Sequence, residues 1–163
     1  MHPTRARRLD DFEYCGPHRY SLTFCAYQRR ALFTDTDLVH VMRTQILRAG
    51  AERSFEISAY CFMPDHLHLL VRGSNQDACL PRFAKHAKQL SGYHGRRHTR
   101  RKIWQAGFFD RLLNEAEDAR GVIAYLLMNP VRAGLAARPE EYPFSGSGIC
   151  ELPELVDQVR PYL

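Results

Sequence analysis

The side chains most able to do chemistry in this sequence are His66 and His68, which stand two positions apart in an alternating apolar run over residues 60–71. Successive side chains of a β-strand point to opposite faces, so these two imidazoles share one face. Neutral imidazole is a common metal ligand. A pair held on one strand can therefore converge on a single small cation. The residues expected to face the other way and supply the core are Leu67, Leu69 and Val71.

The histidine pair alone leaves an ordinary structural role open, because single histidines on strands are more often structural and such pairs also arise by chance. The face that carries His66 and His68 interrupts an otherwise apolar strand. Such an interruption costs stability unless the site has a use. The surrounding pattern therefore favours metal binding.

Tyr125 and Asn129 form a second pair, at the end of a helix expected over residues 115–128. At about 100° per residue, the two side chains fall one turn apart on the same flank, and Pro130 stops the helix. Tyr125 is open to two interpretations: packing with the hydroxyl at the surface, or a nucleophile on a rigid helix beside the carbonyl oxygen of Asn129. The buried stripe of this helix is expected to consist of Ala119, Val122, Ile123, Leu126 and Leu127.

Positive charge is concentrated in one segment of a chain whose net charge is +5. Residues 78–109 contain no aspartate or glutamate, and Trp104, Phe108 and Phe109 end this stretch. Cations neutralise phosphates and aromatic rings stack on unpaired bases, so the pattern favours nucleic acid over a merely solvated charged face. The arginines within residues 5–8 offer a second contact or a basic tail. The cations of the segment are Arg82, Lys85, Lys88, Arg96, Arg97, Arg100, Arg101 and Lys102.

Local patterns place these residues on an alternating set of elements. A tight turn at residues 63–65 is expected to join two strands into an antiparallel hairpin. The order strand, helix, strand, strand, helix, strand, helix predicts the α+β class, as a ferredoxin-like antiparallel sheet with helices on one face. Strands are expected at residues 20–27, 55–62, 66–71 and 108–113, and helices at residues 36–50, 80–93 and 115–128.

The 163 residues predict a single domain with its core at about residues 20–147 and a tail at 148–163. No run of eighteen apolar residues predicts a membrane span, and residues 1–8 lack the apolar stretch of a secretory signal. The five cysteines are odd in number and form no C-x-x-C pair. They fit a reduced cytoplasmic setting better than a disulfide framework or a zinc knuckle.

Three motifs in order resemble the REP-associated tyrosine transposases, which are HUH single-strand DNA endonucleases similar to single-strand insertion-sequence transposases. The motifs are AYCFMPDHLHLLV at residues 59–71, IWQAGFF at 103–109 and YLLMNPVRAGL at 125–135. The later YPFS at 142–145 matches as well, so the resemblance covers about residues 20–147. Asp65 stands where many members carry asparagine, which bears on the turn more than on the site.

The resemblance implies a metal-dependent enzyme acting on single-stranded DNA folded into a palindromic hairpin. His66 and His68 would bind a divalent cation, with Asn129 in the place of the third ligand, which is a glutamine in the insertion-sequence relatives. Tyr125, on the C-terminal helix of the expected fold, would cut one strand through a 5′-phosphotyrosine and allow rejoining. Magnesium or manganese is expected, although imidazole suits manganese better. Arg132, in the third motif, is added to the cations and Trp104 as a DNA contact.

The same resemblance implies a monomer or a homodimer acting at the nucleoid in the cytoplasm. Three alternatives stay open. Water could replace Tyr125 as the nucleophile in a metal-dependent hydrolase. The chain could be a non-catalytic nucleic-acid-binding protein derived from a transposase, or a decayed transposase kept as a fold.

Overall fold

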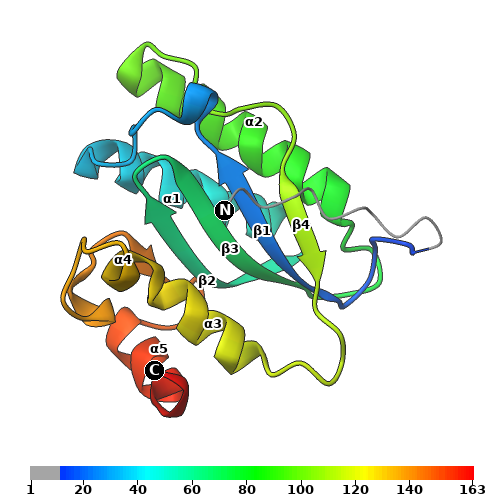
Figure 1. The fold of residues 1–163 in the computed structure, drawn as a ribbon. Coiled ribbons are helices and arrows are strands. Elements are labelled where there is room, and N and C mark those ends of the chain that lie inside the picture. Colours follow the sequence, from blue (N-terminus) through cyan, green and yellow to red (C-terminus); the bar gives the residue numbers. More distant parts are fainter. Residues whose placement is uncertain (1–11) are drawn as a thin grey trace.

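The computed structural model describes residues 12–163 and is built on one antiparallel sheet of five strands in the order β4-β1-β3-β2-β5 (Figure 1). The α+β class and the antiparallel sheet are therefore confirmed. The arginines of residues 5–8 lie outside the described residues. The strands are β1 (Arg19–Cys25), β2 (Phe55–Met63), β3 (His66–Gly73), β4 (Phe109–Leu112) and β5 (Ser145–Gly146).

The hairpin that carries the histidines forms as expected. β2 and β3 pair antiparallel with Met63 opposite His66, so residues 64 and 65 make the turn. On one side of β3, Leu67, Leu69 and Val71 are fully buried. The alternation of residues 66–71 thus predicted both the strand and its core-facing side.

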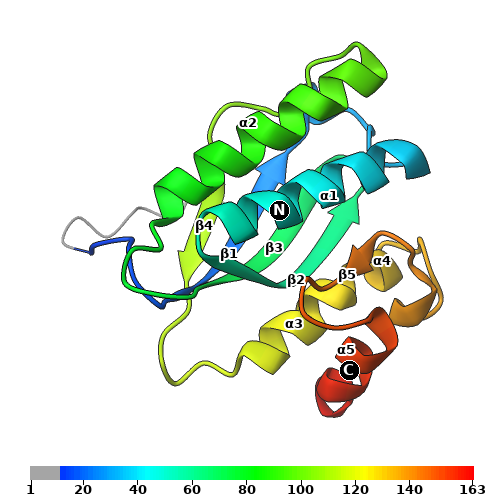
Figure 2. The same cartoon turned by 180° about the vertical axis from the view of Figure 1, so that it is seen from behind.

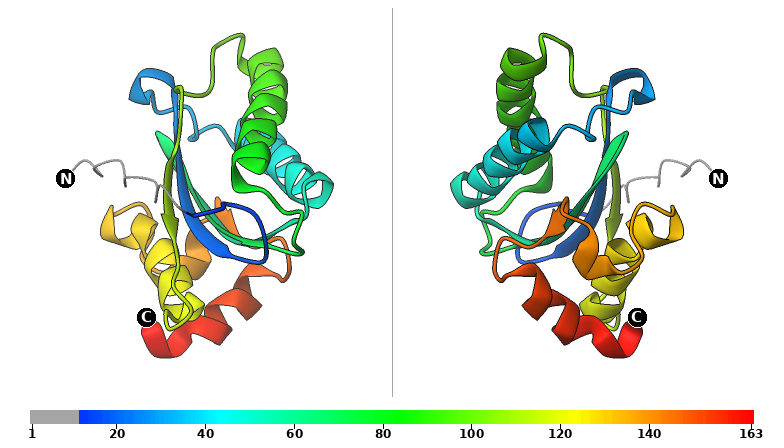
Figure 3. Two further views of the ribbon diagram at one scale, coloured as in Figure 1. Left: turned by 90° about the vertical axis from the view of Figure 1, so that its right-hand side faces the viewer. Right: turned by 90° about the vertical axis from the view of Figure 1, so that its left-hand side faces the viewer.

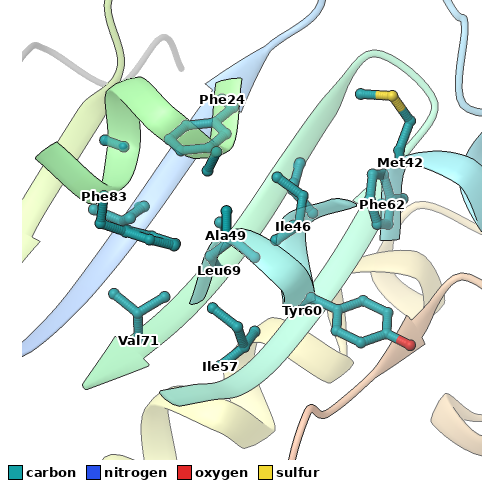
Figure 4. Packing of buried hydrophobic residues seen from close by; sticks show 14 of the residues in the cluster. Phe24, Met42, Ile46, Ala49, Ile57, Tyr60, Phe62, Leu69, Val71 and Phe83 are labelled. Atoms are coloured by element: carbon teal, nitrogen blue, oxygen red, sulfur yellow. The ribbon is translucent and has the colours of Figure 1, made fainter. Parts of the chain in front are cut away.

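Two long helices cover one face of the sheet (Figures 1 and 2). They are α1 (Thr36–Glu52) and α2 (Leu80–Thr99). Asp35 caps α1 by accepting hydrogen bonds from the backbone N–H groups of residues 37 and 38. α2 runs well past the expected residue 93. Side chains from the sheet and both helices fill the larger core, including Phe24, Ile46, Leu69 and Phe83 (Figure 4).

A second helical layer lies on the other face, which corrects the expectation of helices on one face only (Figure 3). It consists of α3 (Ala119–Leu127), α4 (Asn129–Arg132) and α5 (Leu152–Val159). Ala59 and Cys61 of β2 and Leu70 of β3 pack there against Leu127 and Val156. The physical reason is that β2 is apolar on both faces, so each face needs a cover.

The helix that carries Tyr125 is shorter than expected and is not the last one. Asp118 caps α3 by accepting a hydrogen bond from the backbone N–H of Arg120. Pro130 falls in the first turn of α4, where its missing N–H costs nothing, so the chain continues as a further helical turn. The tail at 148–163 folds as α5 and a 3-10 turn, and Tyr162 hydrogen-bonds Asp118. No helix of the described residues is long and apolar enough to cross a bilayer.

Candidate active site: a histidine pair and a clamped tyrosine

His66 and His68 face each other on the side of the sheet that carries α3. Their Nε2 atoms are 2.9 Å apart, and their ring planes are nearly perpendicular, at 88°. Cys61 pairs with His68 across the hairpin and packs in the α3 core, so the histidines share the face of that helix. The pairing that the sequence predicted is therefore present.

Neighbouring side chains hold both rings in place. The Nδ1 of His66 donates to the Asp65 carboxylate at 2.6 Å, and that carboxylate is paired with Arg29 at 2.9 Å. The Nδ1 of His68 lies 3.1 Å from the hydroxyl of Thr23 on β1. Such outer partners fix the tautomer and orientation of metal-binding histidines. With both Nδ1 atoms engaged, the Nε2 atoms of the two rings are left to bind one cation.

His68 is held in its neutral, metal-binding form. The pKa of His68 is lowered to about 3, mainly by burial and in addition by the charges of His66, Arg132 and Arg29. A neutral ring keeps a nitrogen lone pair available for a cation.

Tyr125 and Asn129 are joined by Arg132, a link that the sequence analysis missed. The Nη2 atom of Arg132 donates to the side-chain oxygen of Asn129 at 2.6 Å and to the backbone oxygen of Tyr125 at 2.9 Å. The guanidinium carbon lies 4.2 Å from the centre of the Tyr125 ring. The Tyr125 side chain is 66% exposed. The phenol is thus presented to solvent while its ring and the neighbouring amide are clamped by one arginine.

The histidine pair and the pair formed by Tyr125 and Asn129 are linked by the charge of Arg132 and not by direct contact. Arg132 is close enough to lower the pKa of His68. Within residues 12–163, no hydrogen bond joins Tyr125 or Asn129 to either histidine, and no group of three His, Cys, Asp or Glu side chains could hold a metal ion. Imidazole nitrogens and an amide oxygen are nevertheless donor types that divalent cations accept.

The predicted DNA-binding cations do not gather beside the histidines. α2 lies on the opposite layer, so its exposed cations point away from the histidine face (Figure 3). At its C-terminal end, Arg96, Arg97 and Arg100 line a cavity of about 440 Å³ with Tyr93. Elsewhere Arg82 lines a smaller cavity, Lys85 and Arg101 are exposed, and the Lys102 ammonium lies 4.5 Å from the Tyr27 ring centre.

The Lys88 side chain makes hydrogen bonds within the protein. Its ammonium donates to the backbone oxygens of Gln105 and Gly107, in the loop that follows α2. Burial lowers the pKa of Lys88. This cation therefore supports a loop instead of joining the exposed positive surface.

Trp104 corrects the expectation of an exposed stacking ring. It is only 6% exposed, and its indole N–H donates to the Ser91 hydroxyl at 2.9 Å. Its ring packs edge-on against Phe24. A core residue in this position cannot stack on a DNA base, whereas Phe109 is only half-buried and lies on the histidine face.

Comparisons with known proteins give related sequences and folds. The family model described as "Transposase IS200 like" matches residues 16–126. A REP-associated tyrosine transposase of Escherichia coli (strain K12) is 27% identical over 111 residues, which are 68% of this chain and 65% of that protein. A Haemophilus influenzae relative, provisionally given the same name, is 27% identical over 121 residues, covering 68% of this chain and 69% of the relative. The chain thus spans just under two thirds of the first relative's length.

One solved structure shares the fold over most of its length. It is a REP-associated tyrosine transposase bound to a REP hairpin, with a TM-score of 0.71 and 23% identity, covering 87% of this chain and 81% of that one. The family match includes both histidines and Tyr125. This chain belongs to the IS200-like transposase family.

Proposed function

We propose that this protein cuts and rejoins single-stranded DNA beside hairpins, with Tyr125 as nucleophile. His66, His68 and Asn129 would hold a divalent cation, magnesium or manganese. The observation that carries the proposal is the meeting of the two His Nε2 atoms, 2.9 Å apart, on the sheet face that carries the helix of the exposed Tyr125 phenol.

The cutting step exchanges one phosphodiester bond for another, so the bond energy is conserved. When bound, the cation would neutralise a non-bridging oxygen of the scissile phosphate and stabilise the charge that develops there. The Tyr125 oxygen attacks phosphorus, the 3′ oxygen of the neighbouring nucleotide leaves, and a 5′-phosphotyrosine and a 3′-hydroxyl result. Attack by a second 3′-hydroxyl reverses the step and rejoins a strand.

The residues around the phenol assist this attack. Phenols ionise near pH 10, so at neutral pH a tyrosine nucleophile needs help in losing its proton. The Arg132 guanidinium lies 4.2 Å from the Tyr125 ring centre and holds the ring in place. Asp65 and Thr23 keep the histidine rings in the orientation that binds the cation.

Hairpin DNA is the proposed substrate because related proteins carry the REP name and one of them is seen with a REP hairpin. The cavity lined by Tyr93, Arg96, Arg97 and Arg100 offers cations and one exposed ring for a phosphate backbone. Arg132, in contrast, contacts Tyr125 and Asn129, so we assign it to the catalytic site and not to the DNA-binding cavity. We place the protein in the cytoplasm at the nucleoid, as a monomer or a homodimer.

The test is a covalent adduct between protein and DNA. The protein is incubated with single-stranded hairpin oligonucleotides and Mn²⁺, and the products are separated on a denaturing gel. We expect an adduct with the wild-type protein, loss of it in Tyr125→Phe and strong reduction in His66→Ala. Tyr27→Phe, which removes a tyrosine hydroxyl outside the site and outside that cavity, serves as the matched control and keeps the adduct.

Two of the alternatives give distinct results in this assay. Cleavage that persists in Tyr125→Phe would assign the nucleophile to water. A wild-type protein that binds hairpins but never forms an adduct would make the chain a non-catalytic DNA-binding protein.

A further inference from the structure

Phe109 lies in one row with the histidine pair. Thr23 of β1 is paired with His68 on one side and with Phe109 of β4 on the other. Directly paired residues of neighbouring strands share a face of the sheet. With strands about 4.8 Å apart, the Cα atoms of Phe109 and His68 are separated by about 10 Å. An aromatic ring therefore lies close beside the proposed cation site, on the same surface.

A small cavity opens at this ring. Its volume is about 90 Å³, and its walls are Thr23, Cys25 and residues 105–109. Thr23 is the residue whose hydroxyl contacts His68, and Cys25 is paired with His66. The cavity is therefore adjacent to the histidines and combines a hydroxyl, an amide side chain, backbone polar groups and aromatic carbon.

A bulge in the chain creates the cavity. Gln105 bonds to Cys25 and Phe109 pairs with Thr23, so residues 106–108 all stand opposite Phe24 alone. Gly107 has a φ of +74°, and a side chain added to it would meet nothing within 4 Å, so the bulge faces open space. Bulges of this kind redirect side chains beside functional sites.

Lys88 holds the bulge from the opposite side of the sheet. It extends from α2 and donates to the backbone oxygens of Gln105, which precedes the extra residues, and Gly107, which lies in the middle of them. Its ammonium lies 5.7 Å from the centre of the Phe24 ring. A half-buried cation with two carbonyl partners fixes a loop that would otherwise be free to collapse into the cavity.

We propose that this cavity takes one unpaired base of the DNA strand that passes the histidines, and that the base stacks on Phe109. The inference rests on the proposed function and adds a specificity element to it. The ring supplies stacking, which every base accepts. Thr23 and Gln105 supply hydrogen-bonding groups for the base edge. At about 90 Å³ the cavity is too small for a base pair, so it receives only the edge of one unpaired base, whose ring lies on Phe109.

Fluorescence of 2-aminopurine tests the stacking directly. The probe is placed in turn at each position flanking the cut in a hairpin oligonucleotide, and binding is measured with Tyr125→Phe protein so that no cleavage interferes. We expect strong quenching at one position only. Phe109→Leu should abolish that quenching and Phe109→Tyr should keep it. Equal quenching at all positions, or quenching that survives Phe109→Leu, would overturn the proposal.

An abasic nucleotide at the same position provides a second measurement that does not depend on fluorescence. Losing one stacked base should weaken binding by about 5- to 150-fold. Phe109→Leu should weaken binding to the intact oligonucleotide by a similar factor, and should cause no further loss on the abasic one. Additive losses would show that Phe109 and the base do not contact each other, even if the adduct assay succeeds.

Lys88 is tested against a matched lysine. Lys88→Met should remove the position-specific quenching although Phe109 is intact, because the bulge loses its support. Lys85→Met changes an exposed lysine of the same helix and should retain the quenching, with an effect only on the salt dependence of binding. Thermal unfolding of both variants controls for loss of the fold. Retained quenching in a folded Lys88→Met protein would contradict the role of Lys88.

Discussion

The guanidinium of Arg132 lies over the ring of Tyr125, 4.2 Å from its centre, and donates to the amide oxygen of Asn129 at 2.6 Å. One cationic side chain therefore orders the proposed nucleophile and the proposed third ligand together. The amide oxygen that it holds is the atom that a cation would bind. Arg132 and the cation thus share a partner, and Arg132 sets where Asn129 points before the cation arrives.

Replacing Arg132 should slow adduct formation more than it weakens DNA binding. We expect Arg132→Ala to lower the single-turnover rate by about 10- to 100-fold, because the developing negative charge loses a nearby cation and the phenol loses its support. Arg132→Lys should recover part of the rate. Arg138→Ala, which removes an exposed arginine paired with Glu141, is the control. A rate that is unchanged in Arg132→Ala would remove this residue from the site.

The outer partner of His66 should matter for metal affinity. Asp65→Ala removes the carboxylate that holds the ring, and loss of such partners typically costs about 10- to 100-fold in metal affinity. Asp65→Asn, which keeps an accepting oxygen, should cost less. Calorimetric titration with Mn²⁺ measures both. His86→Ala, at a histidine paired with Glu52 on the α1–α2 layer, should leave Mn²⁺ binding unaltered.

Metal removal should stop the reaction reversibly. A chelator should abolish the adduct, and added Mn²⁺ should restore it, because the charge on the scissile phosphate is otherwise unopposed. DNA binding, measured by fluorescence anisotropy at constant ionic strength, should change much less. An adduct that forms at full rate in excess chelator would show that the histidines have another role.

Stability of the metal-free protein should fall in mild acid because of His68. Its pKa is lowered to about 3 in the folded chain, against an ordinary value near 6.5, so between these limits only the unfolded chain binds the proton. Stability contributed by the neutral ring is therefore present above pH 6.5 and is lost as the pH falls, by at most about 1.4 kcal/mol per pH unit. Denaturant unfolding of wild type and His68→Asn from pH 7 to 4 should show the steeper loss in the wild type. Parallel curves would place His68 in a more solvated setting.

The buried indole of Trp104 should make Ser91 important for stability. Ser91→Ala leaves the indole N–H without its 2.9 Å partner in the core, which costs about 1–3 kcal/mol. Urea unfolding measures the loss. Ser147→Ala, at a half-buried serine outside this core, should cost much less.

The site elements that follow one clear local rule were predictable from the sequence. Alternation placed His66 and His68 on one face, and the helical period placed Tyr125 and Asn129 one turn apart. The helix expected from residue 36 begins there as α1. In each case the rule depends on residues next to one another in the chain, so no knowledge of the packing is needed.

The remaining features depend on contacts between distant segments. Trp104 follows a basic stretch, and its inward position depends on contacts with Ser91 and Phe24, which are distant from it in the chain. The second helical layer had one overlooked signal, the lack of alternation in β2, whose apolar residues on both faces demand two covers. The position of Arg132 was a second overlooked signal. It lies three positions after Asn129 and seven after Tyr125, and this spacing puts all three on one side of a helix.

The contact between Tyr162 and Asp118 ties the 3-10 turn that follows α5 to the capping residue of the helix that presents the phenol. This turn therefore braces the start of the helix that carries the proposed nucleophile, although it contributes no atom to the proposed chemistry.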